Sequence, residues 1–308
     1  MYNGPQRHRD TGTLVKRIRV LSLVLLVCFV ALVVKPSAVQ APARRIVSLI
    51  PAVTEMLFAL GAGDRVAAVS SFDKFPPEVE NIPRVGALLD PNLEKILSLK
   101  PDLVVVYHSQ EDFRRQLDRA GVPTYIYSHA GLADVTATIR SIADRIGSSD
   151  RGRELAARIE AQLAVIRTRA DGQPRPRTLI VFSREAHALR GIYASGGTGF
   201  IHDMVTLAGG DNVFADVKRE AVQATTELIL SRRPDVILEL RAEPLTPDEE
   251  RNELAVWAQL GAVPAVRNGR VHLVVDARTV IPGPRVVEGV EAIAKVLRVL
   301  RFSKVLRF

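Results

Sequence analysis

Cysteine and aromatic residues are scarce in this sequence. Among 308 residues there is one cysteine, Cys28, and one tryptophan, Trp257, and aromatic residues make up 5% of the chain. A single cysteine excludes an intrachain disulfide framework. The cysteine and the six histidines also show none of the spacings that bind zinc, so no metal site is predicted.

The sequence also lacks the short motifs of common enzyme classes. The glycine-rich segment Ser195–Gly199 has no following Lys-Ser or Lys-Thr, and it therefore differs from a phosphate-binding P-loop. No Gly-x-Ser-x-Gly nucleophile elbow is present. We predict that the chain is not an enzyme and that it has no cofactor of its own.

Strong positive charge is missing outside the N-terminus. The formal charge is +8, but residues 1–43 alone carry a net charge of +5, which leaves about +3 for the remainder. No basic stripe with interleaved aromatic residues follows. The high isoelectric point therefore belongs largely to the N-terminus, and no nucleic-acid partner is predicted.

The N-terminus contains an apolar run that is short for a membrane span. Basic residues end at Arg19, and Val20–Val34 is then almost entirely apolar over 15 residues, whereas a bilayer span needs roughly 20. Ala41–Ala43 supplies the small-x-small pattern of a cleavage site. We predict that residues 1–43 are a secretory signal peptide or, alternatively, an N-terminal anchor held through residues 20–34.

Two stretches of the remaining chain are nearly alike. Each begins with a polar residue suited to capping a helix and has a glutamate in the first helical turn. A short apolar run, Pro-Asp and a β-branched strand follow. The two stretches are Asn92–Val104, with Glu94, and Thr225–Ile237, with Glu227. The repeat predicts two lobes built alike, each presenting one acidic helix start.

The pattern around these repeats predicts an α/β fold. Short β-branched runs alternate with helical segments, which is typical of parallel sheets. Residues 133–170 lack a strand signal, and apolar residues recur there at helical spacing, namely Leu155, Ile159, Leu163 and Ile166. We predict two Rossmann-like lobes with parallel sheets, joined by one long backbone helix. The predicted divisions are an N-terminal lobe over residues 44–148, the helix over 149–172 and a C-terminal lobe over 173–308.

Four motifs of the N-terminal half together resemble one known family. They are Ser48–Pro51 followed by Thr54-Glu55, the aromatic, Pro-bearing segment Phe72–Pro77, Asn92–Glu94 and Lys100–Val104. The chain resembles periplasmic substrate-binding proteins of ABC importers, in the subset with a helical backbone that takes up cobalamin, haem and iron-siderophores. The resemblance extends from about residue 45 to residue 300 and is closest to cobalamin-binding proteins.

The resemblance implies a role for the repeated glutamates. In this family each lobe offers one surface glutamate to arginines of the membrane-spanning subunits, and Glu94 and Glu227 fall on those positions. Two carboxylates at a fixed separation could form charge pairs that set the docking orientation. The alternative is that each carboxylate only complements the dipole of its own helix. We expect a monomeric, periplasmic or otherwise extracytoplasmic protein whose partners are an ABC permease and a small-molecule metal chelate.

The resemblance also implies aromatic contacts to the ligand. Phe72 and Tyr107 match positions where cobalamin-binding proteins place aromatic rings against the ligand, and Tyr193 matches another. Leu88 and Ala221 stand where those proteins commonly have tryptophan. The expected ligand is cobalamin or a related corrinoid, held by fewer aromatic rings than is usual in the family.

Arginines near the C-terminal strands leave other ligands open. Arg184, Arg241 and Arg278 follow or flank predicted strands, where they could hold the carboxylates of haem or of a siderophore. Tyr107-His108 could supply an axial ligand to haem iron, or else form a pocket wall and a solvated loop residue. Outside transport, the alternatives are a metal-chelatase-like enzyme and a membrane-tethered chelate sensor.

Overall fold

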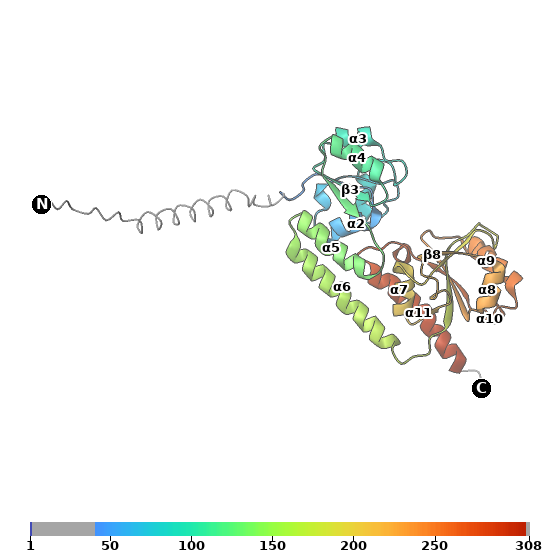
Figure 1. Ribbon diagram of the computed structural model, residues 1–308. Helices are drawn as coiled ribbons and strands as arrows, with labels where there is room; N and C mark the ends of the chain where they lie inside the picture. The colour runs from blue at the N-terminus through green and yellow to red at the C-terminus, as the bar shows by residue number, and fades with distance from the viewer. Residues whose placement is uncertain (2–40, 306–308) are drawn as a thin grey trace. The chain divides into compact units, whose positions relative to one another are not determined.

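The computed structural model describes Met1 and residues 41–305 of the chain (Figure 1). The predicted signal peptide or anchor lies outside these residues except at its two ends. From Pro42 onward the chain forms one compact unit. Among the described helices, none is both long enough and apolar enough to cross a membrane.

The first sheet has four parallel strands in the order β2-β1-β3-β4. These strands are β1 (Ile46–Ser48), β2 (Val66–Val69), β3 (Leu103–Tyr107) and β4 (Thr124–Tyr127). The α-helices and the short 3-10 helices between them are α2 (Pro51–Ala59), η1 (Gly63–Arg65), η2 (Pro77–Asn81), α3 (Leu93–Ser98) and α4 (Glu111–Arg119). The strand–helix alternation that the sequence predicts for this lobe is confirmed.

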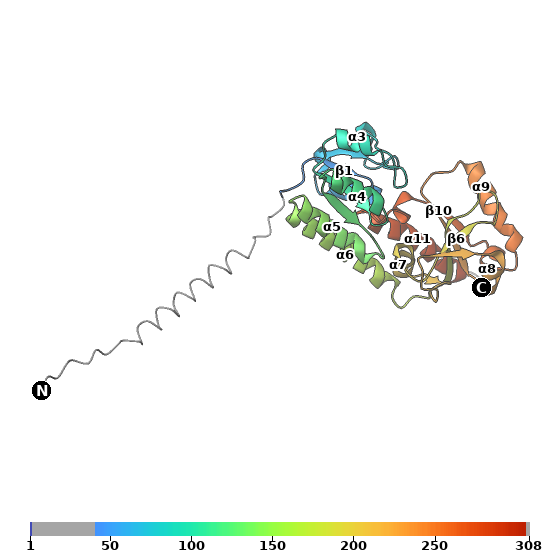
Figure 2. The same ribbon diagram turned by 45° about the horizontal axis from the view of Figure 1, so that its top comes forward.

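Two helices follow this lobe and pack side by side as a hairpin, α5 (Ala133–Arg145) and α6 (Ser149–Ala170) (Figures 1 and 2). The 22 residues of α6 span about 33 Å at 1.5 Å per residue. Its buried face contains the predicted residues Leu155, Ile159, Leu163 and Ile166. Gly152 lets the two helices approach closely, because a Cβ there would meet the Cβ of Ala143. The long helix expected from the sequence is therefore present.

The second sheet is mixed, which corrects the expectation that both sheets are parallel. Its order is β10-β9-β5-β6-β8, with β7 paired to β5. β10, β9 and β5 are parallel, whereas β6 is antiparallel to both β5 and β8. Only residues 184–191 join β5 to β6, and so short a connection cannot make the crossover that parallel strands need. The sequence pattern indicates neither β6 nor β8 as a strand.

The elements of this second lobe are bounded as follows. The strands are β5 (Arg177–Ser183), β6 (Ile192–Ser195), β7 (Asp211–Asn212), β8 (Ala221–Ala224), β9 (Val236–Arg241) and β10 (Val271–Val275). The helices are α7 (Phe200–Leu207), α8 (Thr226–Arg232), α9 (Pro247–Ala255), η3 (Val256–Leu260), α10 (Pro264–Arg267), η4 (Ala277–Thr279) and α11 (Val286–Val305).

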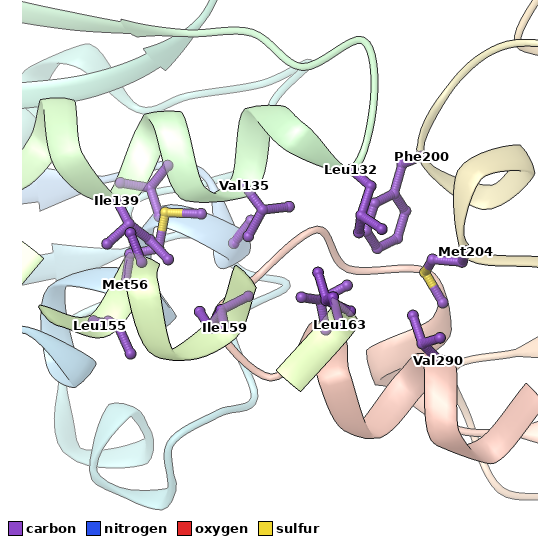
Figure 3. Close-up of a cluster of buried hydrophobic side chains, with 14 of the residues drawn as sticks. Met56, Leu132, Val135, Ile139, Leu155, Ile159, Leu163, Phe200, Met204 and Val290 are labelled. Atoms are coloured by element: carbon purple, nitrogen blue, oxygen red, sulfur yellow. The ribbon is translucent and has the colours of Figure 1, made fainter. Parts of the chain in front are cut away.

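A shared hydrophobic core is continuous from the first sheet to the second. Alternate residues of the central strands face it, such as Ile46 and Val105 in one sheet and Ile180 and Leu238 in the other. Helices α2, α5, α6, α7 and α11 supply further side chains, as Figure 3 shows. The other face of each sheet has a smaller cluster of its own. Because close packing runs through both lobes, it holds them together in addition to α6.

Candidate functional site

The carboxyl-terminal ends of the parallel strands in the two sheets lie near one another. Two ion pairs connect the loops that follow them: Lys74, after β2, lies 2.6 Å from Glu243, after β9, and Arg285, before α11, pairs with Glu55 of α2. Ligand sites of α/β sheets lie beyond these strand ends. We call the following residues the facing edges: 70–77, 107–110 and 128–131 of the first lobe, and 183–193, 241–246 and 276–285 of the second.

The loop after β2 leaves Phe72 exposed to solvent. Oδ2 of Asp73, in the interior, accepts hydrogen bonds from the backbone N–H and the hydroxyl of Ser70, at 2.9 and 2.5 Å. Arg84 donates to the carbonyl oxygens of Ser70 and Asp73. Burial raises the pKa of Asp73 against the opposing effect of these hydrogen bonds. Phe72 itself is 67% exposed, so an apolar ring stands on a fixed loop where a ligand could cover it.

Phe75, in the same loop, is covered by an arginine from the second lobe. The guanidinium carbon of Arg285 lies 3.6 Å from the centre of the Phe75 ring. Nε and Nη2 of Arg285 donate to Oε2 and Oε1 of Glu55, at 2.9 and 2.6 Å. Gly283 leaves room for this pair, because a Cβ there would lie 2.9 Å from Oε2 of Glu55. These contacts hold the loop after β2 against the segment before α11.

Tyr107, at the end of β3, belongs to a cluster of rings. Its centre lies 5.9 Å from that of Tyr127, 6.1 Å from that of His129 and 4.5 Å from that of His108. Desolvation raises the pKa of Tyr107, and Glu220 of the second lobe adds to the rise. Desolvation lowers the pKa of His129, whose buried Nδ1 has no hydrogen-bond partner in the described structure. Burial therefore favours the neutral forms of Tyr107 and His129 at the facing edges.

Tyr193 reaches the same edge from the second lobe. It pairs with Ser183 at the end of β5 and is 42% exposed. Leu88 packs partly into the shared core, and Ala221 is exposed at the start of β8. Leu89 is 94% exposed, an apolar side chain that the sequence does not single out.

The predicted aromatic residues come from separate elements and do not touch. Among the described residues, no ring contact joins Phe72, Tyr107 and Tyr193. Any ligand that engages all three rings would therefore have to bridge the two lobes.

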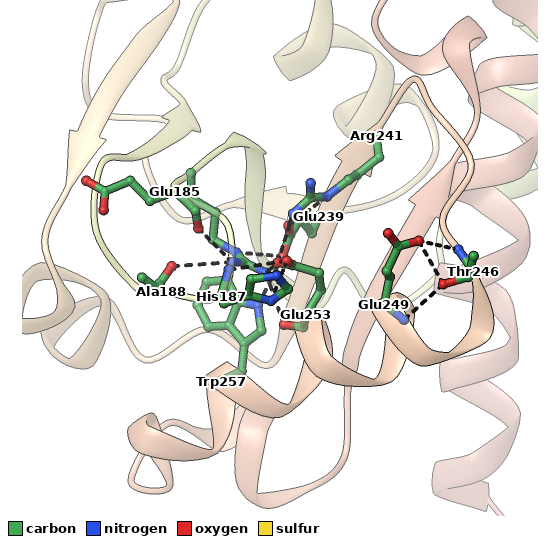
Figure 4. Close-up of polar contacts among 10 residues, drawn as sticks. Glu185, His187, Ala188, Glu239, Arg241, Thr246, Glu249, Glu253 and Trp257 are labelled. Carbon is green, nitrogen blue, oxygen red and sulfur yellow. Dashed lines mark hydrogen bonds and ion pairs between the residues drawn. The ribbon is translucent and has the colours of Figure 1, made fainter.

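Arg184 and Arg241 share two buried glutamates, Glu239 and Glu253. Figure 4 shows Arg241 beside both glutamates. Oε2 of Glu239 accepts from Nε of Arg184 at 3.1 Å, and Oε1 accepts from Nη2 of Arg241 at 2.6 Å. Oε2 of Glu253 lies 2.5 Å from Nη2 of Arg184 and 3.1 Å from Nη2 of Arg241. The side chains of Arg184, Glu239 and Glu253 are 0%, 2% and 4% exposed. Charges at this depth require partners, and each of these charges has one.

The position of Glu239 follows from the alternation of β9. Leu238 and Leu240 point into the shared core, so Glu239 points to the opposite face with Ile237. There Nε1 of Trp257 donates to Oε2 of Glu239 at 3.1 Å. Trp257 packs inside the second lobe, where it is 1% exposed.

Arg278 is paired as well. Its Nε and Nη2 donate to Asp276 at 2.6 to 3.0 Å. Desolvation opposes ionisation of Asp276, but the hydrogen bonds and charge of Arg278 outweigh it and lower the pKa of Asp276. The three arginines indicated by the sequence thus each have a carboxylate partner. Each stays a predicted ligand-binding residue, with its charge compensated at least in part within the chain.

A pH dependence of stability follows from Glu253. Burial opposes its ionisation, but the Arg184 charge, the hydrogen bond from the His187 N–H and Arg241 together lower the pKa of Glu253. A carboxyl group whose pKa is lower in the folded than in the unfolded protein stabilises the fold. This contribution is complete at pH values above the unfolded-state pKa and is lost as the pH falls through the folded-state pKa. Between about pH 6 and pH 3, urea unfolding should show a smaller loss of stability for Glu253→Gln than for the wild type. Glu185→Gln, at an exposed ion pair, should lose as much unfolding free energy over this pH range as the wild type does. An equal loss in all three proteins would show that Glu253 does not contribute this pH dependence.

Glu94 and Glu227 occupy the same position in α3 and α8. Each is the second residue of its helix, and the residue two places earlier caps it. Oδ1 of Asn92 accepts from the N–H of Lys95 at 2.9 Å, and Oγ1 of Thr225 accepts from the N–H of Leu228 at 3.2 Å. Neither glutamate is therefore the N-cap of its helix.

The surroundings of the two glutamates also repeat. Ser98 and Ser231 each donate to the carbonyl oxygen three residues earlier, at 2.8 Å in both copies. Lys100 and Arg233 both have a φ of 49°. The internal repeat seen in the sequence is thus a repeat of local geometry.

The two carboxylates differ in one respect. Both residues are exposed, and within the described structure Glu94 has no ion pair or hydrogen-bond partner for its carboxylate. The N–H of Glu227 and the hydroxyls of Thr225 and Thr226 lower the pKa of Glu227. Both stay available to a partner at the surface.

Four residues of the site are not predicted as site residues from the sequence, although Glu55 stands in one of the family motifs: Glu55, Glu239, Glu253 and Arg285. A signal exists for two of them. Glu239 interrupts the apolar run of β9, and Glu55 lies in the largely apolar helix α2. A charge in an otherwise buried element indicates a partner elsewhere in the chain. In the part of the chain that is described, no group of three or more His, Cys, Asp or Glu residues is arranged to hold a metal ion.

The chain matches the model of the periplasmic binding protein family over residues 46–276. It is 31% identical over 257 residues to the uncharacterized ABC transporter substrate-binding lipoprotein YvrC of Bacillus subtilis (strain 168), covering 82% of this chain and 79% of that one. The chain therefore belongs to the periplasmic binding protein family, the substrate-binding components of ABC importers. Binding proteins of this family deliver their ligand to an ABC permease.

Two solved structures have a similar fold. The periplasmic vitamin B12-binding protein BtuF of Vibrio cholerae has a TM-score of 0.73 and 26% identity, covering 84% of this chain and 98% of that one. The periplasmic heme-binding protein RhuT of Roseiflexus sp. RS-1, in apo form, has a TM-score of 0.69 and 28% identity, covering 82% and 99%. The two-lobed α/β fold predicted from the sequence is confirmed, while the two neighbours bind different ligands.

Proposed function

We propose that this chain is the extracytoplasmic solute-binding component of an ABC importer and that it captures a corrinoid between its two lobes. The observation that carries the proposal is the placement of exposed aromatic rings on both facing edges. Phe72 is 67% and Tyr193 is 42% exposed. Tyr107, at the end of β3, adds a cluster of further rings. Flat macrocycles bury large areas against such rings. The vitamin B12-binding neighbour supports the same ligand class.

The pairing of the arginines favours a corrinoid over haem. Haem carries two carboxylates, and a site for it gains from guanidinium groups that lack a protein partner. Arg184, Arg241 and Arg278 are each paired with a carboxylate of this chain. A corrinoid periphery carries amides, which need hydrogen bonds but no counter-charge.

Haem or an iron-siderophore remains the second candidate ligand. The observation that favours it is the ring pair of Tyr107 and His108, with His129 nearby, since phenol and imidazole groups are axial ligands of haem iron. The heme-binding neighbour of similar fold agrees with this alternative.

Delivery to the permease would use Glu94 and Glu227. The two carboxylates repeat in position on the two lobes and lie at the surface. The continuous core and α6 hold the lobes together, so the two glutamates would meet basic groups of the permease as a pair. We expect the protein to act as a monomer in this exchange.

Titration of the leaderless protein with chelates tests the ligand. Cyanocobalamin, haemin and a ferric trihydroxamate are added separately, and binding is followed by calorimetry and visible absorbance. We expect cyanocobalamin to bind most tightly, and Phe72→Ala and Tyr193→Ala each to weaken it about tenfold, since a lost aromatic contact removes contact area and ring stacking. Val165→Ala, at a 48% exposed position on α6, is the control. Tight haemin binding without a corrinoid response would refute the proposed ligand.

A further inference from the structure

A cavity of about 420 Å³ opens at the ends of β5 and β9. Six charged groups lie in it or beside it, linked by ion pairs. The cations are Lys74, Arg184 and Arg241, and the anions are Glu239, Glu243 and Glu253. Their formal charges cancel. The pair of Lys74 and Glu243 connects the cavity to the loop that carries Phe72, so the cavity belongs to the facing edges.

The two arginines differ in how much of their hydrogen-bonding capacity is used. Arg184 donates to Glu239 and Glu253 and to the carbonyl oxygens of residues 185, 188 and 253, which occupies its three nitrogens. Arg241 uses Nε and Nη2 for the two glutamates. Its Nη1 has no partner in the described structure, and its side chain is 26% exposed. Arg241 therefore presents free N–H donors at the cavity.

We propose that Nη1 of Arg241 donates a hydrogen bond to a side-chain carbonyl of the bound chelate, and that this subsite selects amide-bearing chelates over carboxylate-bearing ones. The inference rests on the proposed function, because it takes the cavity as the place that receives the periphery of the ligand. It makes Arg241 a specificity-determining residue, with Glu239 and Glu253 setting its effective charge.

The selectivity follows from the charge balance. A carboxylate that enters the cavity loses its hydration, which costs much more for an ion than for an amide. The attraction of the carboxylate to Arg241 offsets little of this hydration free energy, because Glu239 and Glu253 already compensate the charge of Arg241 and Glu243 lines the same cavity. An amide carbonyl gains the hydrogen bond from Nη1 without that cost.

The selection of amides over carboxylates can be tested with the wild-type protein alone. Leaderless protein is titrated with cyanocobalamin and with its monocarboxylic acid derivatives, in which one peripheral amide is replaced by a carboxylate. We expect at least one acid isomer, the one whose altered group enters the cavity, to bind about tenfold more weakly. Equal affinity for the amide and for every acid would overturn the inference and leave the corrinoid assignment intact.

Two variants test whether this selectivity arises from Arg241 and its partner glutamates. Glu253→Gln gives the cluster a net positive charge and should narrow the amide-to-acid ratio about tenfold. Arg241→Gln with Glu253→Gln restores neutrality, removes the donor and should weaken the amide and the acid alike. Glu154→Gln, at the exposed pair with Arg158 on α6 and outside the facing edges, is the control. Circular dichroism checks folding, and the wild-type comparison stands even where a variant does not fold. An amide-to-acid affinity ratio of the Glu253→Gln variant equal to that of the wild type would overturn the role of the charge balance.

Other ligands separate this inference from the proposed function. Tight binding of a neutral ferric trihydroxamate, with no corrinoid binding, would refute the corrinoid but support selection of uncharged peripheries. Tight binding of haemin would refute both, because haemin carries two carboxylates.

Discussion

Reversing both surface glutamates, Glu94→Lys with Glu227→Lys, is expected to lower ligand uptake through the permease by at least about 100-fold, because like charges placed across an interface cost several kcal/mol. The affinity for the ligand in the absence of permease should stay unchanged. Both residues lie in the first turns of α3 and α8, outside the facing edges. The measurements are ligand uptake and ligand-stimulated ATP hydrolysis by the reconstituted transporter, together with the calorimetric affinity of the isolated protein.

The caps make this variant suitable for the test. Asn92 and Thr225 supply the side-chain caps of the two helices, so replacing the glutamates leaves both helix starts intact. The melting temperature of the double variant should accordingly stay close to that of the wild type. A stable double variant with undiminished ligand affinity would attribute any loss of uptake to docking.

A matched control changes the same number of charges elsewhere. Glu111→Lys with Glu250→Lys reverses two exposed glutamates in the first turns of α4 and α9, one in each lobe. This control should retain uptake, since a general change of net charge acts on association only through screened, long-range fields. Each single reversal at Glu94 or Glu227 should give an intermediate loss. Wild-type uptake by the Glu94→Lys, Glu227→Lys protein would show that neither glutamate contributes to docking.

Local patterns were sufficient to predict the helical connection and the repeat. The spacing of Leu155, Ile159, Leu163 and Ile166 defines one face of α6, and that face is buried. The likeness of Asn92–Val104 and Thr225–Ile237 extends to capping and backbone angles, because each copy contains the residues that form those interactions. Periodicity and capping act within a few residues, so the sequence displays them directly.

The strands β6 and β8 could not be predicted in the same way. β8 is a four-residue edge strand in which Ala221 and Gln223 are exposed while Val222 and Ala224 face the second lobe, so the alternation is too short to stand out in the sequence. The antiparallel pairing of β6 depends on the tight turn after β5 and on a partner about 30 residues further along the chain. Neither factor leaves a periodic signal in the chain.

The state of the arginines depends on contacts between distant residues. Arg184 and Glu253 are 69 residues apart in the hydrogen bond that joins them, and Glu55 and Arg285 are 230 apart. An arginine after a strand has the same sequence pattern whether it faces a ligand or a buried glutamate. The acidic residue inside β9 was the available indication that some of this positive charge is consumed within the protein.

Removing Arg285 should cause a large loss of stability. The Glu55 side chain is 3% exposed and receives two hydrogen bonds from Arg285. Arg285→Met would leave a buried carboxylate without its partner, which typically costs about 3–5 kcal/mol of unfolding free energy. Equilibrium urea unfolding of the leaderless protein measures this loss, and Arg190→Met, whose pair with Glu185 is exposed, is the control with a change near zero.

The two partners should not be equivalent. Arg285 is 25% exposed and stacks on Phe75, so its charge can reach water when Glu55 is replaced. Glu55→Met should therefore destabilise the protein less than Arg285→Met does. The double variant should recover part of the loss, since an apolar pair in place of a buried ion pair is often close to neutral. Equal losses for both single variants, with no recovery in the double variant, would mean that shape at this contact matters more than charge.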